Sequence, residues 1–217
     1  EISDLVNLNA LGLSNCGLGG PIPPELGGLD NLIVLSLNGN DFTGPIPIEL
    51  GNLDEIRHLY PYSNDLTGPI PVQLADLAML STLDLSNNGL QGSIPPELGN
   101  LTALYTLKLS SCGLTGSIPP ELGNLSNLHN LILSFNSLEG SIPSSLGQLD
   151  SLTKLDLRDN NLSGEIPSQL GQMDSLERID LCNNLLTGSI PPELGNLSEL
   201  DMLYLYSNNL SGPVPPE

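Results

Sequence analysis

The decapeptide Gly-Ser-Ile-Pro-Pro-Glu-Leu-Gly-Asn-Leu occurs unchanged at residues 92–101, 116–125 and 188–197. The copies begin at multiples of 24 residues from one another. Extending this spacing divides the chain into nine units, which begin at Leu5, Leu29, Leu53, Leu77, Leu101, Leu125, Leu149, Met173 and Leu197. All nine follow the pattern L-x-x-L-x-x-L-x-L-x-x-N-x-L-x-G-x-I-P-x-x-L-G-x, whose places are numbered positions 1 to 24.

A unit of 24 residues is too small to bury its own apolar side, so the units must stack on one another. We therefore expect a single array over residues 1–217. The leucine pattern with Asn at position 12 is that of a leucine-rich repeat. The L-x-G-x-I-P half resembles the plant-type subclass, found in ectodomains of plant receptor-like kinases, receptor-like proteins and polygalacturonase-inhibiting proteins. The resemblance implies an α/β fold: a right-handed leucine-rich-repeat solenoid, shaped as a horseshoe or superhelix, with one parallel concave β-sheet and irregular convex returns.

The residues themselves agree with this expectation. Positions 5 to 11 alternate as a half-buried strand does, with Leu at positions 7 and 9 facing inward. Pro at position 19 lacks an N–H donor and suits an irregular return. Leu at position 14 and Ile at position 18, such as Leu114 and Ile118, complete the core. The amide of Asn at position 12 is expected to bond backbone groups of its own and neighbouring coils.

The ends of the chain match the repeat pattern without recognisable terminal caps. Residues 1–4 fit positions 21 to 24, and Glu217 is again at position 21. Both terminal coils are therefore expected to expose a leucine-lined cross-section, which capping units cover in most solenoids. The expectation is an interior part of a longer array.

The formal charge of −20, with only five Lys plus Arg, disfavours nucleic acid and anionic membranes as partners. No apolar run is long enough for direct membrane insertion of this segment. Cys16 and Cys112, at position 12, lie about 20 Å apart if coils stack at strand spacing. Cys182, at position 10, is also out of reach, so three free thiols are predicted, with Cys182 the most reactive.

Catalysis is not indicated, and the chain is not expected to be an enzyme. His58 and His129 are three units apart, and Cys182 is about 24 Å from His58, whereas a nucleophile and its base need about 3 Å. Asp156 and Asp180 stand beside Lys154 and Arg178, which makes a poor metal cage. No metal and no cofactor are predicted.

Outward positions 6, 8, 10, 11 and 13 are the candidate ligand-binding surface, because this face carries most of the aromatic and basic side chains, which are typical of binding hot spots. One patch comprises His58, Tyr60 and Tyr62, with Pro61 replacing an inward Leu between the tyrosines. The second comprises Ile132, Phe135, Lys154, Arg158, Arg178, Met202, Tyr204 and Tyr206. Lys154 with Asp156 and Arg178 with Asp180 form candidate neutralising pairs, which would leave Arg158 available. The alternative interpretation is that these charged side chains only neutralise one another in solvent, and that the aromatic rings are isolated exposed side chains without a binding role.

Five Asn-Leu-Ser/Thr sequons are candidate N-glycosylation sites: Asn100, Asn124, Asn161, Asn196 and Asn209. Glycosylation would place the protein outside the cell or on its surface, as an acidic glycoprotein. The alternative is that Asn-Leu-Ser/Thr belongs to the repeat pattern itself, which leaves a cytoplasmic location open.

The main functional hypothesis is a non-catalytic recognition module, the ligand-binding region of a receptor-like protein or kinase. It binds a protein or peptide on its concave face, with a co-receptor or oligomer contact through its lateral faces. The alternatives are a secreted inhibitor or scaffold resembling polygalacturonase inhibitors, and a cytosolic segment of a larger protein. Ice binding would use Thr43, Thr67, Thr115 and Thr187 at position 15, but Gln91 and Glu139 interrupt that row.

Overall fold

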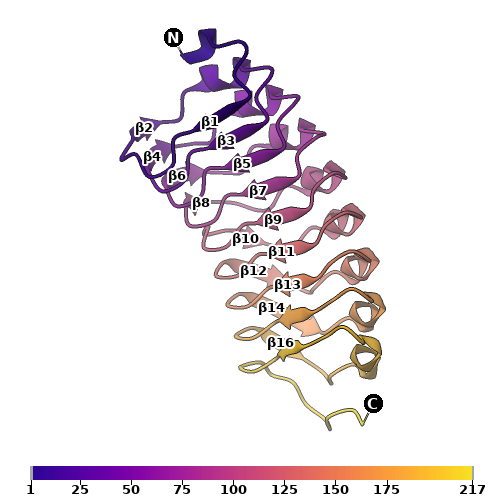
Figure 1. The fold of residues 1–217 in the computed structure, drawn as a ribbon. Helices are drawn as coiled ribbons and strands as arrows, with labels where there is room; N and C mark the ends of the chain where they lie inside the picture. Colours follow the sequence, from indigo (N-terminus) through magenta and orange to yellow (C-terminus); the bar gives the residue numbers. More distant parts are fainter. Residues whose placement is uncertain (1, 217) are drawn as a thin grey trace.

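The computed structural model describes residues 2–216 as a stack of coils that follow one another from the N-terminus to the C-terminus (Figure 1). The first half of each coil contributes a strand to one nine-stranded parallel sheet. Its strands are β1 (Ala10–Gly12), β3 (Val34–Ser36), β5 (His58–Tyr60), β7 (Thr82–Asp84), β9 (Thr106–Lys108), β11 (Asn130–Ile132), β13 (Lys154–Asp156), β15 (Arg178–Asp180) and β17 (Met202–Tyr204).

Each strand of this sheet pairs with residues 24 positions away, as Leu35 does with Leu59. The strands cover positions 6 to 8 and are shorter than the expected positions 5 to 11. The ladder nevertheless continues past them, because the amide of Leu37 donates to the Tyr60 carbonyl at 3.0 Å. Regular strand geometry stops by position 11, where residues such as Asn87 adopt a positive φ of 55°. The solvent side of this sheet, formed by positions 6, 8 and 10 and by the turn residue at position 11, is called the concave face below. Position 13, also expected on this face, lies instead in the lateral sheets described next, where Asp41, Asp65 and Asn161 each begin a strand.

The return path is more ordered than the irregular convex returns expected from the sequence. It contains two further four-stranded parallel sheets along one lateral side (Figure 1). Their strands are β2 (Gly19–Pro21), β4 (Asp41–Gly44), β6 (Asp65–Gly68) and β8 (Gly89–Leu90), followed by β10 (Thr115–Gly116), β12 (Ser137–Gly140), β14 (Asn161–Glu165) and β16 (Leu185–Thr187). All of these strands end before position 19, so the proline there, which lacks an N–H donor, does not interrupt their pairing.

A short 3₁₀ helix ends each of these returns on the opposite side of the coil (Figure 1). The helices are η1 (Ile2–Asp4), η2 (Pro24–Gly28), η3 (Ile48–Asn52), η4 (Val72–Asp76), η5 (Pro96–Asn100), η6 (Pro120–Asn124), η7 (Ser144–Gln148), η8 (Ser168–Gln172) and η9 (Pro192–Asn196). Pro fits the first helical position because its missing N–H would have no partner there. The glycine at position 23 lets coils approach, since a Cβ at Gly123 would overlap the backbone of Ser145. None of these helices is long and apolar enough to cross a membrane.

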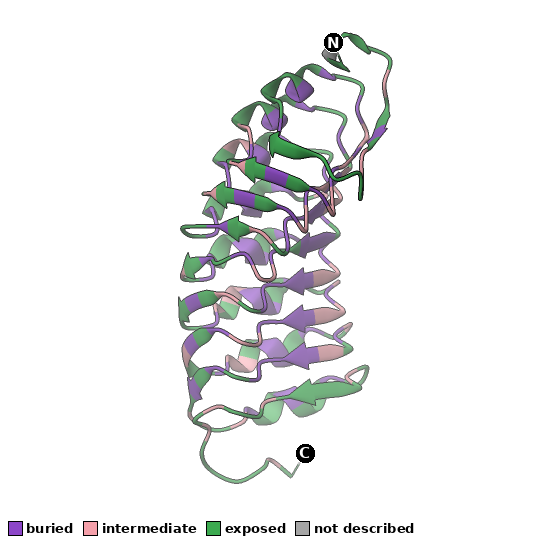
Figure 2. Ribbon diagram, turned by 90° about the vertical axis from the view of Figure 1, so that its left-hand side faces the viewer, coloured by how far each residue is buried: buried purple, intermediate pink, exposed green. Residues whose placement is uncertain are grey.

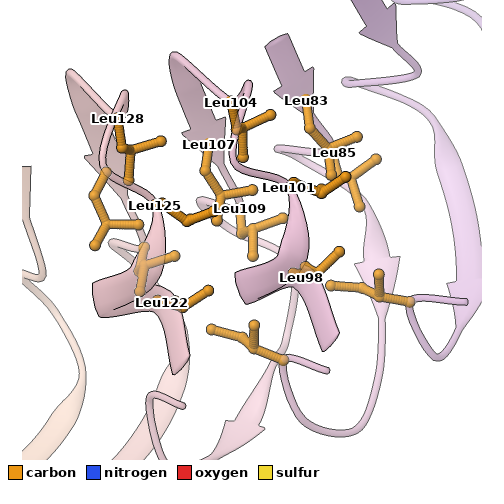
Figure 3. Packing of buried hydrophobic residues seen from close by; sticks show 14 of the residues in the cluster. Leu83, Leu85, Leu98, Leu101, Leu104, Leu107, Leu109, Leu122, Leu125 and Leu128 are labelled. Carbon is orange, nitrogen blue, oxygen red and sulfur yellow. The ribbon is translucent and has the colours of Figure 1, made fainter. Parts of the chain in front are cut away.

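The core lies between the nine-stranded sheet and the 3₁₀ helices. Figure 3 shows leucines of neighbouring coils meeting there. Among them are Leu107 on β9 and Leu109 directly after it, and Leu98 on η5 and Leu101 directly after that helix. Leu114, at position 14, is fully buried. Each such side chain contributes about 1.5–3 kcal/mol of burial free energy. The interior is therefore a set of ladders with one leucine or isoleucine per coil.

The asparagine ladder behaves as predicted from the sequence. The side-chain amide of Asn136 donates to the carbonyls of Leu109, one coil earlier, at 2.7 Å and of Leu133, in its own coil, at 2.9 Å. Its oxygen accepts the amides of Cys112 and Leu114 at 3.1 and 3.0 Å. With a further bond from the same amide to the Ser134 carbonyl at 3.3 Å, one side chain satisfies five backbone groups and ties two coils together.

The terminal coils expose apolar side chains, as expected from the sequence. Leu5 and Val6 are 52% and 60% exposed at one end, and Val214 is 81% exposed at the other. In Figure 2 the last strand, β17, is coloured as exposed, whereas the strands in the middle of the sheet have buried centres. The reason is that no further coil covers these two ends in the structure.

All three cysteines are free thiols, as predicted, but their expected order of exposure is wrong. Cys16 is exposed, whereas Cys112 and Cys182 are buried. Cys16 belongs to the first coil and has no preceding coil to cover it. Cys182 lies at an outward position, but its thiol turns to the Asp180 carboxylate and donates to it at 3.0 Å.

Candidate ligand-binding surface

The predicted concave residues fall into two separate groups on the nine-stranded sheet. His58, Tyr60 and Tyr62 lie on and directly after β5, near the N-terminal end. The other group lies on β13, β15 and β17 and on the turn after β11. We call the six residues Phe135, Asp156, Arg158, Arg178, Asp180 and Tyr204 the C-terminal concave cluster, because contacts described below connect them. Ile132, which was also predicted here, is 9% exposed and contributes little surface.

Two buried carboxylates organise the C-terminal concave cluster. Asp156 and Asp180 are paired neighbours on β13 and β15 and are 3% and 2% exposed. The Arg158 guanidinium reaches both, with Nε 3.6 Å from Asp156 Oδ1 and Nη1 3.5 Å from Asp180 Oδ2. Arg178 Nη2 lies 3.0 Å from the same Asp180 oxygen. Burial raises the pKa of Asp156 above its usual value, and the nearby Arg158 opposes this shift.

This arrangement corrects the predicted pairing of charges. Arg178 does pair with Asp180, as expected. Arg158, expected to be available, is instead held by two carboxylates, and Asp156 pairs with Arg158 rather than with Lys154. Among the residues that the structure describes, Lys154 has no ion-pair partner. Lys154, which is half-buried, is therefore the cation of this surface whose charge no carboxylate of the described residues pairs with.

Each arginine of the cluster also lies against an aromatic ring. Arg158 Cζ is 5.1 Å from the centre of the Phe135 ring, and Arg178 Cζ is 5.0 Å from that of Tyr204. A guanidinium within about 6 Å of a ring centre is attracted to the ring face. Phe135 and Tyr204 remain 49% and 38% exposed. Two fixed rings thus face solvent, each supported by an arginine that a buried aspartate holds in place.

Tyr206 extends this surface along the last coil. Its ring is 6.4 Å from that of Tyr204 in an edge-on arrangement, and it is 61% exposed. Hydrogen bonding with Cys182 raises the pKa of Tyr206. Burial, followed by hydrogen bonding with Asp180, raises the pKa of Cys182. The thiol therefore stays protonated and acts as a donor inside the cluster.

The group near the N-terminal end lines a hollow on the concave face. Tyr60, Tyr62, Asp84 and Lys108 belong to its walls, together with serine and asparagine side chains. The rings of His58 and Tyr60 are parallel, with an interplanar angle of 4° and centres 6.0 Å apart. Lys108 Nζ is 3.7 Å from Asp84 Oδ2.

Pro61 lies buried between the two tyrosines of this hollow. The equivalent amides of Leu37 and Leu85 donate to Tyr60 and Lys108 carbonyls in the next coil. Pro61 has no N–H, so the carbonyl of Asp84 lacks that donor. One ladder bond is therefore lost at Pro61, and the ladder resumes two residues later, where the Ser63 amide donates to the Ser86 carbonyl at 2.8 Å.

One ring pair lies outside the predicted surface. Tyr105 and His129 stack with ring centres 4.0 Å apart and an interplanar angle of 19°. Both occupy position 5, just before the strands begin. Their spacing of 24 residues could have predicted this contact from the sequence. It was not predicted because position 5 was not included among the outward positions.

The five sequon asparagines are all exposed. Asn100, Asn124 and Asn196 end the helices η5, η6 and η9, and Asn161 begins β14 on the lateral side. None of the five lies on the concave face. Across residues 2–216, no group of three or more His, Cys, Asp and Glu side chains is placed to hold a metal ion.

Comparisons with known proteins agree on the type of repeat. A family profile described as "Leucine-rich repeat region" matches residues 96–212. A second, described as "Leucine Rich Repeat", matches residues 7–29, 31–53 and 79–101. No curated protein matches the sequence significantly.

Solved structures provide close matches over 99% of the chain. One is the ectodomain of the plant membrane receptor kinase GASSHO1/SCHENGEN3 from Arabidopsis thaliana, in complex with CASPARIAN STRIP INTEGRITY FACTOR 2 (46% identity, TM-score 0.96). Another is the plant peptide hormone receptor RGFR1 in complex with RGF2 (38% identity, TM-score 0.97). The chain spans only 26% and 34% of these two receptor chains. A plant ice-binding protein also matches (32% identity, TM-score 0.83), and 69% of its chain is covered.

Proposed function

Because the chain belongs to the leucine-rich repeat family, we propose that it is the ligand-binding region of an extracellular receptor-like protein or kinase. It recognises a peptide or protein with its concave face and catalyses no reaction. Support comes from the two receptor structures that it resembles, since one holds CASPARIAN STRIP INTEGRITY FACTOR 2 and the other holds RGF2. The alternatives are a secreted inhibitor or scaffold and a cytosolic segment of a larger protein. The full-length reading frame would distinguish these two from the receptor.

The observation that carries this proposal is the geometry of the C-terminal concave cluster. Phe135 and Tyr204 expose large apolar rings, whose burial by a partner is favourable in water. Contact with Arg158 and Arg178 restricts both rings before any ligand arrives. Restricting a side chain in advance lowers the entropy that binding must remove. The cluster is therefore a prearranged pair of aromatic anchors.

The remaining predicted residues take supporting roles in this proposal. Lys154 provides positive charge on a strongly acidic protein, which suits an acidic group of the ligand. Tyr206 continues the aromatic surface beyond Tyr204. Asp156 and Asp180 do not contact the ligand but hold the two arginines in position. Lys154 and Tyr204 lie on β13 and β17, and Tyr206 follows β17, so an extended peptide running across the strands reaches all three.

A display selection tests this proposal even though the natural ligand is unidentified. A library of random linear peptides is selected on the wild-type protein, and the enriched peptides are titrated against Tyr204→Ala and Phe135→Ala. We expect each substitution to cost more than about 1 kcal/mol of binding, as truncation of a hot-spot residue does. Tyr105→Ala is the matched control, since it removes an exposed tyrosine outside the concave face.

Two outcomes would contradict the assignment to this cluster. Peptides that bind both cluster variants as tightly as wild type would place the site elsewhere. Equal losses for Tyr105→Ala and for the convex-side variant Glu97→Ala would indicate binding without a defined face. The stability of each variant is measured in parallel, so that unfolding is not mistaken for lost binding.

The extracellular location is a separate part of this proposal. Its support is the exposure of all five sequon asparagines on surfaces away from the concave face. Expression of the full-length protein in plant cells, followed by mass spectrometry of its glycopeptides, tests it. Glycans on Asn100, Asn124 or Asn161 are the expected result, and a chain carrying none would favour the cytoplasmic alternative.

Ice binding is a second candidate, favoured by the match to a plant ice-binding protein. Thr43, Thr67 and Thr115 are exposed on the lateral sheets, but Gln91 and Glu139 interrupt the row as the sequence predicts. A thermal hysteresis measurement decides this point. Ice crystals that grow freely in the presence of the protein would remove the candidate.

A further inference from the structure

The hollow at the N-terminal end of the concave face is separate from the C-terminal concave cluster and has a different chemical character. Its volume is about 760 Å³, within the range of about 300–1,000 Å³ typical of small-molecule sites. It lies across β3, β5, β7 and β9, whereas the C-terminal concave cluster lies on later coils. The two surfaces therefore share no residue.

One wall of the hollow is aromatic. Tyr60 and Tyr62 project from consecutive outward positions of one coil, and the His58 ring lies parallel to Tyr60. All three rings are half-buried rather than fully exposed. The His58 ring is oriented by Thr82, with Nδ1 and Oγ1 3.2 Å apart. Tyr60 and Tyr62 thus give the hollow an aromatic side, and His58 lies next to Tyr60 outside its lining.

The rest of the hollow is lined by small neutral polar side chains. Ser14 donates to the Asn38 oxygen at 2.6 Å, which directs the Asn38 amide group. Ser36, Ser86, Asn87 and Ser110 add hydroxyl and amide groups. Hydroxyls both donate and accept hydrogen bonds, and amides offer one group of each kind. This lining matches a ligand that carries many hydroxyl groups.

The charges of the hollow cancel each other. Asp84 is 8% exposed, and its carboxylate pairs with Lys108 at 3.7 Å. The Asp84 oxygen Oδ1 also accepts the Ser86 amide at 3.1 Å. An anionic ligand would have to compete for Lys108 on a protein of formal charge −20. The hollow therefore favours a neutral ligand.

A peptide fits this hollow less well than a sugar does. Peptides commonly bind by adding a strand to a sheet edge or by filling apolar pockets. Both concave surfaces lie on the face of the same sheet, where side chains and not a free strand edge meet a ligand, so they differ in their lining. The aromatic wall stands beside hydroxyl and amide groups instead of an apolar pocket.

We propose that this hollow binds a short neutral oligosaccharide of hexopyranose units. The Tyr60 and Tyr62 rings pack against the C–H faces of the sugar rings. The Asn38 and Ser86 side chains and the Asp84 carboxylate bond the sugar hydroxyls. The protein thereby has two recognition surfaces on one sheet, one for a peptide or protein and one for a carbohydrate.

Saturation-transfer NMR with two tetrasaccharides tests this proposal on the whole chain. Cellotetraose and maltotetraose are titrated separately, because their β- and α-linkages present the same hydroxyls in different shapes. We expect at least one to bind with a Kd no weaker than about 1 mM. Tyr62→Ala should weaken binding by about threefold to tenfold, the effect of losing one aromatic contact.

Controls separate the hollow from nonspecific sugar contact. Tyr105→Ala removes an exposed tyrosine outside the hollow and should leave the Kd unchanged. Asp84→Asn should weaken binding, and thermal unfolding shows whether each variant is folded. No saturation transfer from either sugar at about 10 mM, or binding that survives the Tyr60→Ala, Tyr62→Ala double variant, overturns the proposal. Either result leaves the peptide selection at the C-terminal concave cluster unaffected.

Discussion

Arg158 lies over the ring of Phe135, with Cζ 5.1 Å from the ring centre, while Phe135 itself has a backbone φ of 56°. The left-handed region is unfavourable for residues with a Cβ and is tolerated best by Gly, Asn and Asp. The same position holds Asn in Asn15, Asn87 and Asn183. Phe is therefore a less stable residue than Asn at this left-handed position. Backbone strain of this kind is typical of functional sites.

Replacing Phe135 by Asn should stabilise the fold and weaken ligand binding. Relief of the left-handed conformation is worth up to about 1–2 kcal/mol, and loss of the exposed ring–guanidinium contact costs about 0.5–1 kcal/mol. We expect a net gain of up to about 1 kcal/mol in urea unfolding. Protein for this comparison is made in bacteria, because the substitution creates a sequon with Asn136 and Ser137. A variant that is less stable than the wild type and binds the selected peptides with full affinity would contradict both the expected gain in stability and the expected loss of binding.

Truncation of Leu114 tests the core ladder. Leu114 is fully buried at position 14 in the middle of the stack, so Leu114→Ala should destabilise by about 2–5 kcal/mol in urea unfolding. Thr115→Ala is the matched control on the adjacent exposed residue and should change stability by less than about 0.5 kcal/mol. Similar small effects for both variants would show that the ladder does not carry the fold.

Alkylation should distinguish the three thiols of the native protein. Iodoacetamide is expected to modify Cys16 quickly, because it lies exposed on the first coil. Cys112 and Cys182 are buried, and their raised pKa values also lower the thiolate fraction. Both should react only after unfolding. Peptide mass mapping over time measures this order. Rapid labelling of Cys182 would contradict its burial and would support the exposure expected from its outward position.

Stability at alkaline pH should depend on Cys112. Burial raises the pKa of Cys112 to about 12 in the folded protein, from an ordinary value of 9.0. Between these values the unfolded thiol loses its proton and the folded one keeps it. Folded protein then binds more protons, so stability falls as pH rises above about 9, by up to about 1.4 kcal/mol per pH unit from this group.

Cys112→Ser provides the comparison, because its hydroxyl can still donate to the Leu85 carbonyl that Cys112 Sγ contacts at 3.2 Å. Urea unfolding is measured between about pH 9 and pH 10.5 under reducing conditions. The wild type should lose stability more steeply than the variant. Parallel curves for the two proteins would mean that Cys112 ionises in the folded state as it does in the unfolded state.

Much of the fold was predictable from the sequence, because every interior coil has the same neighbours. A period of 24 places Leu107 between Leu83 and Leu131 in the sheet. The environment of each position therefore repeats, and the pattern of one unit predicts the burial of all. The asparagine ladder follows for the same reason, since Asn136 meets the same backbone groups as Asn160 does one coil later. The second sheets were missed because their pairing uses backbone groups of positions without a distinctive side chain.

Tertiary structure alone decided which side chains act together on the surface. Lys154 and Arg158 are equally placed in sequence to reach Asp156, two residues from each, yet Arg158 pairs with it and also reaches Asp180. A long side chain can reach carboxylates on its own strand and on both neighbouring strands. The repeat spacing does not determine which of these carboxylates it pairs with. The exposure of the cysteines also depends on tertiary contacts. Cys16 is exposed because no coil packs in front of the first one, and Cys182 is buried because its side-chain rotamer turns the thiol toward Asp180. Backbone periodicity thus determined the scaffold, whereas side-chain packing between coils determined the candidate site.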